Sequence, residues 1–258
     1  MAGIVDAHCH LQHELFDADR DAVIERAAEG GIERLLVPGW DMPSSVAALE
    51  LAERHPDIVR GAVGVHPHDA ATTDERAWHA LETLAADPRC AAIGEIGLDF
   101  HRNLSAPDVQ RDALARQLAL AGRLGLPVIV HDREAHTEIT ASLVAWSGET
   151  DRAVPGMLHA FSGAAAMAAT LTARGFLVSF AFPVAFRSAV GPRATAVSLE
   201  SGTYLVETDA PYLGPDREAR NEPTTVLRVA AELGRLRGTE PTTVAREARE
   251  AFDRLIGP

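Results

Sequence analysis

The chain has 258 residues, of which 47% are hydrophobic, and its formal net charge is −13. The length fits one large α/β domain, and the apolar share is ample for a buried core. The acidic balance argues against a broad surface for duplex nucleic acid, because phosphate contacts depend on clustered Lys and Arg.

The sequence predicts neither a membrane span nor a secretory signal. It has no apolar run of about 18 residues, and its first residues show no basic end followed by an apolar stretch. We therefore expect a cytoplasmic protein without membrane contact. The two cysteines, Cys9 and Cys90, stand in apolar surroundings, which favours buried free thiols over a disulfide framework.

Short apolar runs alternate with segments of helical periodicity along the whole chain, without a linker or a low-complexity tract. The predicted strands are 3–8, 33–38, 59–65, 90–97, 126–131, 154–160, 176–180 and 203–209. The predicted helices are 18–29, 44–54, 74–86, 108–124, 134–147, 164–174, 224–236 and 242–255. Continuous apolar strands are typical of a sheet covered on both faces. The pattern predicts a single (β/α)8 TIM barrel over residues 1–258, with 180–199 its least regular part.

The first strand ends in the sequence VDAHCHL, which carries two histidines two positions apart. In an extended chain such side chains share one face, so His8 and His10 point together while Cys9 turns away. The pair is therefore able to chelate one ion, although an H-x-H sequence alone is a weak signal.

Four other predicted strands finish in a single potential ligand after several apolar residues. These ligands are Glu95, His131, His159 and Asp209. Any one such residue is more often a hydrogen-bonded rim residue. In a parallel barrel, however, all carboxyl ends of strands meet at one mouth, and six such groups without a cation are costly to bury.

The six residues together predict one or two divalent ions, since borderline metals accept imidazole and carboxylate together. Glu95 is the predicted bridge, because a carboxylate offers two oxygens. Asp209 is the predicted general base for an attacking water. The two carboxylates balance only half the charge of two such ions, so the pocket is expected to attract an anionic group.

Seven motifs in order resemble those of the TatD family of metal-dependent hydrolases, within the amidohydrolase superfamily. They are DAHCHL, GVHPHDA, IGEIGLDFHR, PVIVHDREA, LHAFSG, ETDAPYLGP and RNEP, and they span nearly the whole chain. The resemblance implies a TIM barrel and a hydrolase related to deoxyribonucleases, some of them 3′ to 5′ exonucleases. Carried over by position, it implies the same six ligands: His8, His10, Glu95, His131, His159 and Asp209.

The resemblance also implies residues that face the substrate. It makes His66 an active-site residue near the metals or the phosphate, and Arg133 a phosphate ligand through a bidentate contact. Arg102 and Asn221 are further phosphate candidates, each equally consistent with bracing a loop. The sequence departs from the family pattern at 179–186, which is bulkier and more apolar, and at 216–220, and both segments are expected on substrate-facing loops.

The predicted function is hydrolysis of phosphodiester bonds in DNA ends or short oligonucleotides, with Zn, Mg or Mn as the metal. The alternative is hydrolysis of a small ester, amide or lactone at the same site, because a water activated there also attacks a carbonyl. A metal-bound adaptor without catalysis is a third hypothesis, disfavoured because every ligand position is filled.

Overall fold

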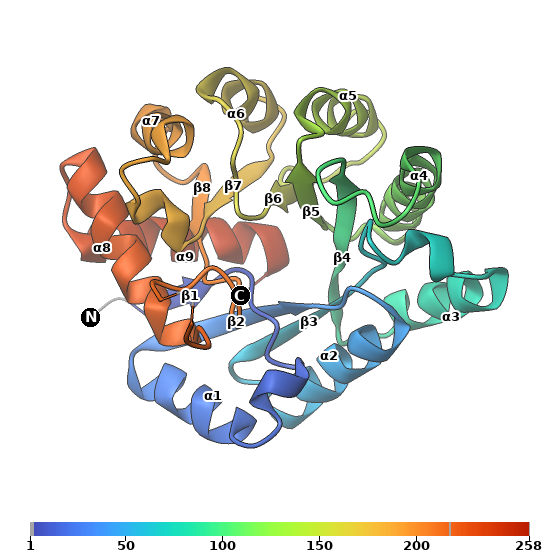
Figure 1. Cartoon of the computed structure of the whole chain (residues 1–258), viewed down its shortest axis with the longest axis horizontal. Helices are drawn as coiled ribbons and strands as arrows, with labels where there is room; N and C mark the ends of the chain where they lie inside the picture. Colours follow the sequence, from blue (N-terminus) through green and yellow to red (C-terminus); the bar gives the residue numbers. More distant parts are fainter. Residues whose placement is uncertain (1–2, 217, 258) are drawn as a thin grey trace.

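A computed structural model describes residues 3–216 and 218–257, so that Arg217 of the 216–220 segment and three terminal residues lie outside the description. Within the described residues, eight parallel strands form one sheet in the order β1 to β8. The strands are β1 Ile4–Asp6, β2 Ile32–Pro38, β3 Val59–Val63, β4 Cys90–Asp99, β5 Val128–Arg133, β6 Gly156–Leu158, β7 Leu177–Phe180 and β8 Tyr204–Val206. Figure 1 shows them at the centre of a ring of helices, which confirms the predicted TIM barrel.

The helices follow the strands in alternation. They are α1 Arg20–Glu29, α2 Met42–Arg54, α3 Glu75–Ala85, α4 Pro107–Leu124, α5 His136–Trp146, α6 Ala165–Thr172, α7 Val190–Ser198, α8 Val226–Arg237 and α9 Pro241–Ile256. The segment 180–199, for which the sequence predicts the least regular structure, contains α7 and a short 3-10 turn, η3 Phe182–Ala185. Among the described residues, no helix is both long enough and apolar enough to cross a bilayer.

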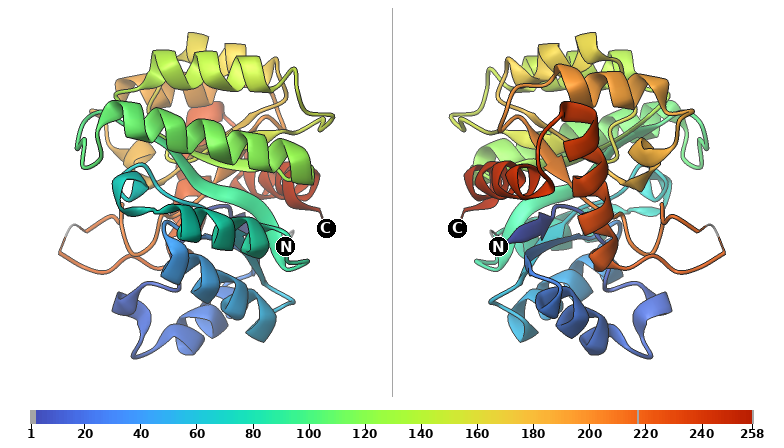
Figure 2. Two further views of the ribbon diagram at one scale, coloured as in Figure 1. Left: turned by 90° about the vertical axis from the view of Figure 1, so that its right-hand side faces the viewer. Right: turned by 90° about the vertical axis from the view of Figure 1, so that its left-hand side faces the viewer.

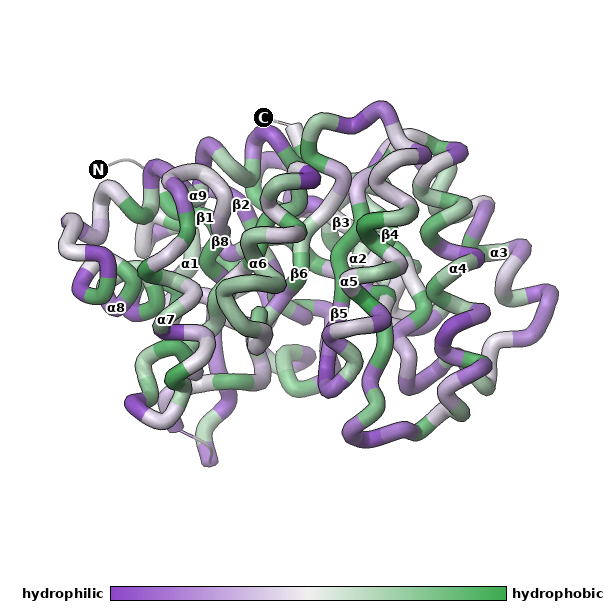
Figure 3. The backbone as a smooth tube through the Cα atoms, turned by 90° about the horizontal axis from the view of Figure 1, so that it is seen from above, coloured by the Kyte–Doolittle hydropathy of each residue, from purple (hydrophilic) through white to green (hydrophobic). Residues whose placement is uncertain are grey.

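The core lies between the strands and the helices. Strand residues such as Val37, Ile129 and Leu205 are fully buried, and α9 closes the ring by packing against β1 and β8. The apolar stretches coincide with strands such as β4 and β6, whereas polar stretches gather on the outer loops (Figure 3). Both cysteines are buried free thiols, as predicted.

The first and last strands meet at a seam formed just beyond the strand ends. The amide of Ala7 donates to the carbonyl of Val206 at 3.0 Å, and the amide of Asp209 donates to that of His8 at 2.9 Å. The buried Asp6 carboxylate accepts the backbone amide and the hydroxyl of Thr208, at 2.9 and 2.5 Å. These bonds therefore hold the backbone next to His8 against the backbone next to Asp209.

Strand β4 is longer than predicted and irregular in its middle. Its pairing with β5 shifts register between Ile93 and Ile96. Gly97 has a φ of +148°, and a Cβ there would lie 2.0 Å from the carbonyl oxygen of His131. Glycine alone permits this approach of two backbones. As a result Glu95 lies inside β4 rather than at its end, which corrects the expectation from the sequence.

Candidate metal centre

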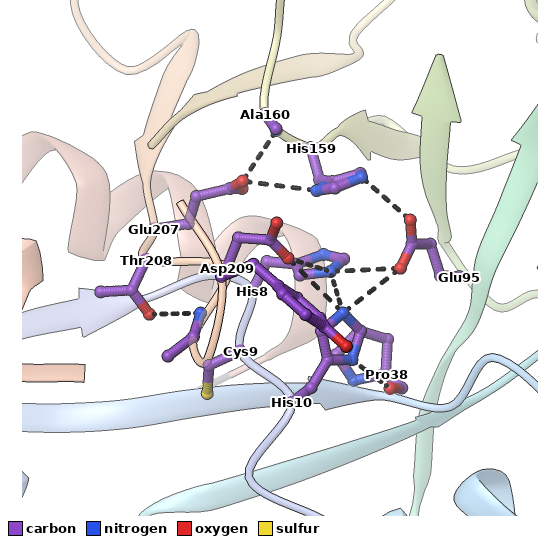
Figure 4. Close-up of polar contacts among 12 residues, drawn as sticks. His8, Cys9, His10, Pro38, Glu95, His159, Ala160, Glu207, Thr208 and Asp209 are labelled. Carbon is purple, nitrogen blue, oxygen red and sulfur yellow. Dashed lines mark hydrogen bonds and ion pairs between the residues drawn. The ribbon is translucent and has the colours of Figure 1, made fainter. Parts of the chain in front are cut away.

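The structure brings the six predicted ligands together at the carboxyl end of the barrel, and Figure 4 shows five of them, all except His131. Glu95 and His131 lie within β4 and β5, whereas the other four follow short strands: His8 and His10 after β1, His159 after β6 and Asp209 after β8. The strands that precede these four ligands, β1, β6 and β8, are each shorter than predicted. The four polar side chains therefore follow the last residues of their strands rather than ending the strands.

One group of donors surrounds a single point. The Nε2 atoms of His8 and His10 are 3.1 Å apart. The Oε2 atom of Glu95 lies 3.4 Å from His8 Nε2 and 3.5 Å from His10 Nε2. The Oδ1 atom of Asp209 lies 3.6 and 3.5 Å from the same two nitrogens. Two imidazole nitrogens and two carboxylate oxygens therefore face one another around that point.

A second group gathers around the other oxygen of Glu95. Its Oε1 atom lies 2.9 Å from His131 Nδ1 and 2.9 Å from His159 Nε2, and these nitrogens are 3.1 Å apart. Glu95 thus presents one carboxylate oxygen to each group, as a carboxylate that bridges two ions must do.

Contacts behind the ligands fix their ring orientations. His10 Nδ1 lies 3.2 Å from the carbonyl oxygen of Pro38, so that it donates there and leaves the lone pair of Nε2 directed at the centre. Glu207 is fully buried, accepts the amide of Ala160 at 2.7 Å and places Oε1 3.4 Å from His159 Nδ1.

Charge at the centre is balanced among closely packed groups. Burial would raise the pKa of Glu95, but the imidazoles of His159 and His66 hold that pKa well below its usual value. Burial would lower the pKa of His10, but hydrogen bonds with Asp209 and Glu95 raise that pKa to about 9, so a bound cation would displace the proton of Nε2 and take up its lone pair. Four imidazoles and two carboxylates at these distances fit a divalent cation, since imidazole and carboxylate together suit borderline metals.

His66 lies beside the second group but differs from its members. Its Nε2 atom is 3.3 Å from Glu95 Oε1. By distance alone, His66, Glu95 and His131 are close enough to bind one metal ion together. However, its Nδ1 atom accepts the backbone amide of His68 at 3.1 Å. The proton of the neutral ring must then sit on Nε2. Burial lowers the pKa of His66 to about 4, so this ring is a neutral donor.

Two buried carboxylates near the centre were not among the predicted residues. Asp99 places Oδ2 2.7 Å from His68 Nε2 and 3.5 Å from His131 Nε2, and Glu207 stands behind His159. Asp99 lies four positions after Glu95, and Glu207 two before Asp209. The period-two argument that paired His8 with His10 could have found both.

A cavity of about 550 Å³ opens above the centre. Arg102 and Arg133 line it, as the sequence predicted for phosphate-facing residues, and neither forms an ion pair within residues 3–216 and 218–257. Asn221 is different: it is buried, and its amide donates to the carbonyls of Thr208 and Tyr212 at 2.9 and 2.7 Å. These contacts support the loop-bracing role, and Asn221 does not line the cavity.

No described residue of either atypical segment lines the cavity, which corrects the expectation that they face the substrate. In 179–186, Phe180, Phe182 and Val184 are buried. In the described part of 216–220, the guanidinium of Arg220 binds Asp19 and lies over the ring of Phe16, 4.5 Å from its centroid. These four side chains therefore serve packing.

Comparison with known proteins gives consistent matches over the full chain. Residues 5–257 match the family described as TatD related DNase. The chain is 36% identical over 257 residues to YabD, a metal-dependent hydrolase of Bacillus subtilis, with 98% of each covered. It is 35% identical over 258 residues to the 3′-5′ ssDNA/RNA exonuclease TatD of Erwinia tasmaniensis, covering 97% of this chain and 98% of that protein.

The fold is similar to that of a solved relative. The crystal structure of YJJV, a TatD homologue from Escherichia coli, superposes with a TM-score of 0.90 at 28% identity, covering 99% of this chain and 98% of the other.

Proposed function

Because this chain belongs to the TatD family and is a metal-dependent hydrolase, we propose that it hydrolyses phosphodiester bonds at the 3′ ends of single-stranded nucleic acid. The relative from Erwinia tasmaniensis carries that activity in its name. The division of Glu95 between two groups of donors is the observation that carries the proposal.

We propose that His8, His10, Glu95 and Asp209 hold one divalent ion and that Glu95, His131 and His159 hold a second. Bound there, such ions activate water and neutralise charge on a phosphate. Side chains of the protein supply the proton transfer. Burial would raise the pKa of Asp209, but its hydrogen bond with His10 and the nearby imidazoles lower that pKa, so Asp209 is an ionised carboxylate able to accept a proton from water.

The cavity walls supply groups that bind a phosphodiester. The Nε2–H of His66 is directed at the same region as Glu95 Oε1 and is able to donate to a phosphate oxygen. Arg102 and Arg133 offer planar guanidinium groups, which match the geometry of two phosphate oxygens. A small neutral ester or lactone would leave both guanidinium groups without a partner, so the cavity favours the phosphodiester over the carbonyl substrate.

The direct test incubates the purified protein with Mg²⁺, Mn²⁺ or Zn²⁺ and end-labelled single-stranded DNA, beside a panel of esters and lactones. Metal-dependent shortening from the 3′ end is the expected result. Turnover of carbonyl substrates alone would overturn the proposal.

Asp209→Asn tests the role of the proton acceptor. We expect the variant to fold and to lose at least about two orders of magnitude in rate, the usual contribution of a general base. Asp112→Asn, on the exposed face of α4, is the control for loss of one carboxylate. Near-normal turnover by Asp209→Asn with unchanged metal content would remove Asp209 from the mechanism.

A further inference from the structure

One wall of the cavity carries three flat side chains that the proposed chemistry does not use. His13, Trp40 and Tyr212 all line the cavity. The ring centroids of His13 and Trp40 are 5.9 Å apart, and those of His13 and Tyr212 are 5.7 Å apart. We call this group the aromatic wall. The plane of the His13 ring is inclined by 41° to that of Trp40 and by 86° to that of Tyr212, so the three rings enclose a corner of the cavity and each offers its own face or edge to a ligand.

The aromatic wall borders the first group of donors. The ring of His10 lies 5.3 Å from that of Trp40 and 6.3 Å from that of Tyr212, measured between centroids. The two cavity-lining arginines are on other strands: Arg133 ends β5 and Arg102 follows β4. The cavity thus has an aromatic side near His10 and a side with two arginines near the ends of β4 and β5.

The aromatic wall is held by polar contacts that leave its surface available. The hydroxyl of Tyr212 lies 3.0 Å from His13 Nε2. His13 Nδ1 accepts the amide of Leu15 at 3.1 Å, so that the proton of the neutral ring is on Nε2 and is donated to the Tyr212 hydroxyl. Asn221 holds the backbone of Tyr212 through its carbonyl, in the loop after β8 that projects from the molecule in Figure 2.

Tyr212 is nevertheless 50% exposed. A large ring whose hydroxyl is held by His13 and that is still half open to solvent at the rim of the cavity is available to a ligand. A ligand that matches both sides of the cavity carries a planar group for the aromatic wall and a phosphate for the arginines, as a nucleotide does. A base inside a duplex has both faces covered by its neighbours, so an unpaired base is the one that reaches such a ring most readily.

We propose that His13, Trp40 and Tyr212 form a stacking site for one unpaired terminal nucleobase, with the attached phosphate directed toward Arg102 and Arg133. The inference rests on the proposed function, because it assigns to the nucleic-acid end its place in the cavity. It makes the aromatic wall the element that selects a single-stranded end with an intact base.

The test compares two fluorescent oligonucleotides that differ only in the terminal base. Both have phosphorothioate linkages that resist hydrolysis, and one has an abasic residue at its 3′ end. Binding to the metal-loaded protein is followed by fluorescence anisotropy. Stacking of one base on an aromatic side chain is worth about 1–3 kcal/mol, so the intact oligonucleotide is expected to bind roughly 5- to 150-fold more tightly.

Variants of the aromatic wall locate the source of that preference. Tyr212→Ala, at a half-exposed position, is expected to reduce the preference at least about fivefold, the lower limit of one lost stacking contact. Tyr212→Phe keeps the ring and is expected to keep most of the preference. Leu15→Ala is the control, since Leu15 is an exposed apolar residue two positions after His13 that does not line the cavity.

Equal binding of the two oligonucleotides by the wild-type protein overturns the inference, as does a wild-type preference in Tyr212→Ala. A preference that depends on Tyr212, in a protein that cleaves no nucleic acid with any metal, supports the stacking site and rejects the proposed function. The two failures are therefore distinguishable.

Discussion

The atom that each imidazole nitrogen faces decides what that histidine is able to do at the centre. His10 donates from Nδ1 to the carbonyl of Pro38 and so directs a lone pair inward, whereas His66 accepts at Nδ1 from the amide of His68 and directs a proton inward. Two histidines at similar distances from Glu95 are thus opposite in function, one a candidate ligand and the other a candidate donor to substrate.

His66→Asn is expected to retain the full metal content and to lose about 10²- to 10³-fold in rate, the usual effect of removing one donor to a developing negative charge. His10→Asn is the matched comparison, and it is expected to lose bound metal. Metal content measured by mass spectrometry, beside the rate, separates the two roles. A clear drop of metal content in His66→Asn would make His66 a ligand instead.

Glu207→Gln tests the buried carboxylate behind His159. Glutamine preserves the size of the side chain and an acceptor for the Ala160 amide, but it removes the negative charge from His159 Nδ1. Mutation of a residue that contacts a metal-binding histidine from behind typically changes metal affinity by about 10- to 100-fold. The variant is therefore expected to bind the metal at least about tenfold more weakly in a calorimetric titration. Glu200→Gln, on the surface, is the control, and equal affinities in the two variants would contradict the assignment.

Among the elements, β4 has the most demanding local geometry, because it places Glu95 in its interior and must approach β5 closely. The register shift after Ile93 and the glycine at 97 allow this.

Gly97→Ala is expected to destabilise the protein by more than about 4 kcal/mol, because the added Cβ meets the backbone carbonyl of His131 and neither strand has room to move. Gly125→Ala is the matched variant: its φ of +64° is also positive, but no atom lies within 4 Å of the new Cβ. There the cost is only that of a left-handed conformation, about 1–2 kcal/mol. Urea unfolding of both variants measures the difference, and similar losses would show that backbone strain alone matters.

The observed strands and helices largely coincide with the predicted ones, because an apolar run bounded by polar residues is a signal within the local sequence. The same signal predicts the ligands His8 and His10 and those near the ends of β5 and β8. The positions of Asp99 and Glu207 were readable too, but they were missed because each stands in the same run as a more obvious ligand. His13, Trp40 and Tyr212 left no periodic signal, since they lie on three loops whose meeting depends on turn geometry.

For the whole molecule, the seam between β1 and β8 is the feature on which the arrangement depends. These short strands are joined by few backbone hydrogen bonds, and the buried Asp6 carboxylate supplements them by binding Thr208 twice. The helix α9 covers the seam from outside. The first group of donors draws on both sides of this join, with His8 and His10 on one side and Asp209 on the other.

Asp6→Ala is expected to lower the free energy of unfolding by at least about 2 kcal/mol, because the buried amide and hydroxyl of Thr208 lose their acceptor. Asp6→Asn keeps an oxygen acceptor and is expected to lose less. Hydrogen exchange followed by mass spectrometry should show faster exchange in peptides that cover residues 4–10 and 204–210, ahead of the other strands. Uniform acceleration over the chain would argue that Asp6 supports the core generally.

The seam also has a consequence for the protein while it is being synthesised. His8 and His10 leave the ribosome long before Asp209 and the loop with Tyr212. A nascent polypeptide therefore lacks a complete first group of donors until β8 joins β1. The proposed hydrolytic activity is thus expected only once the ring of strands is complete.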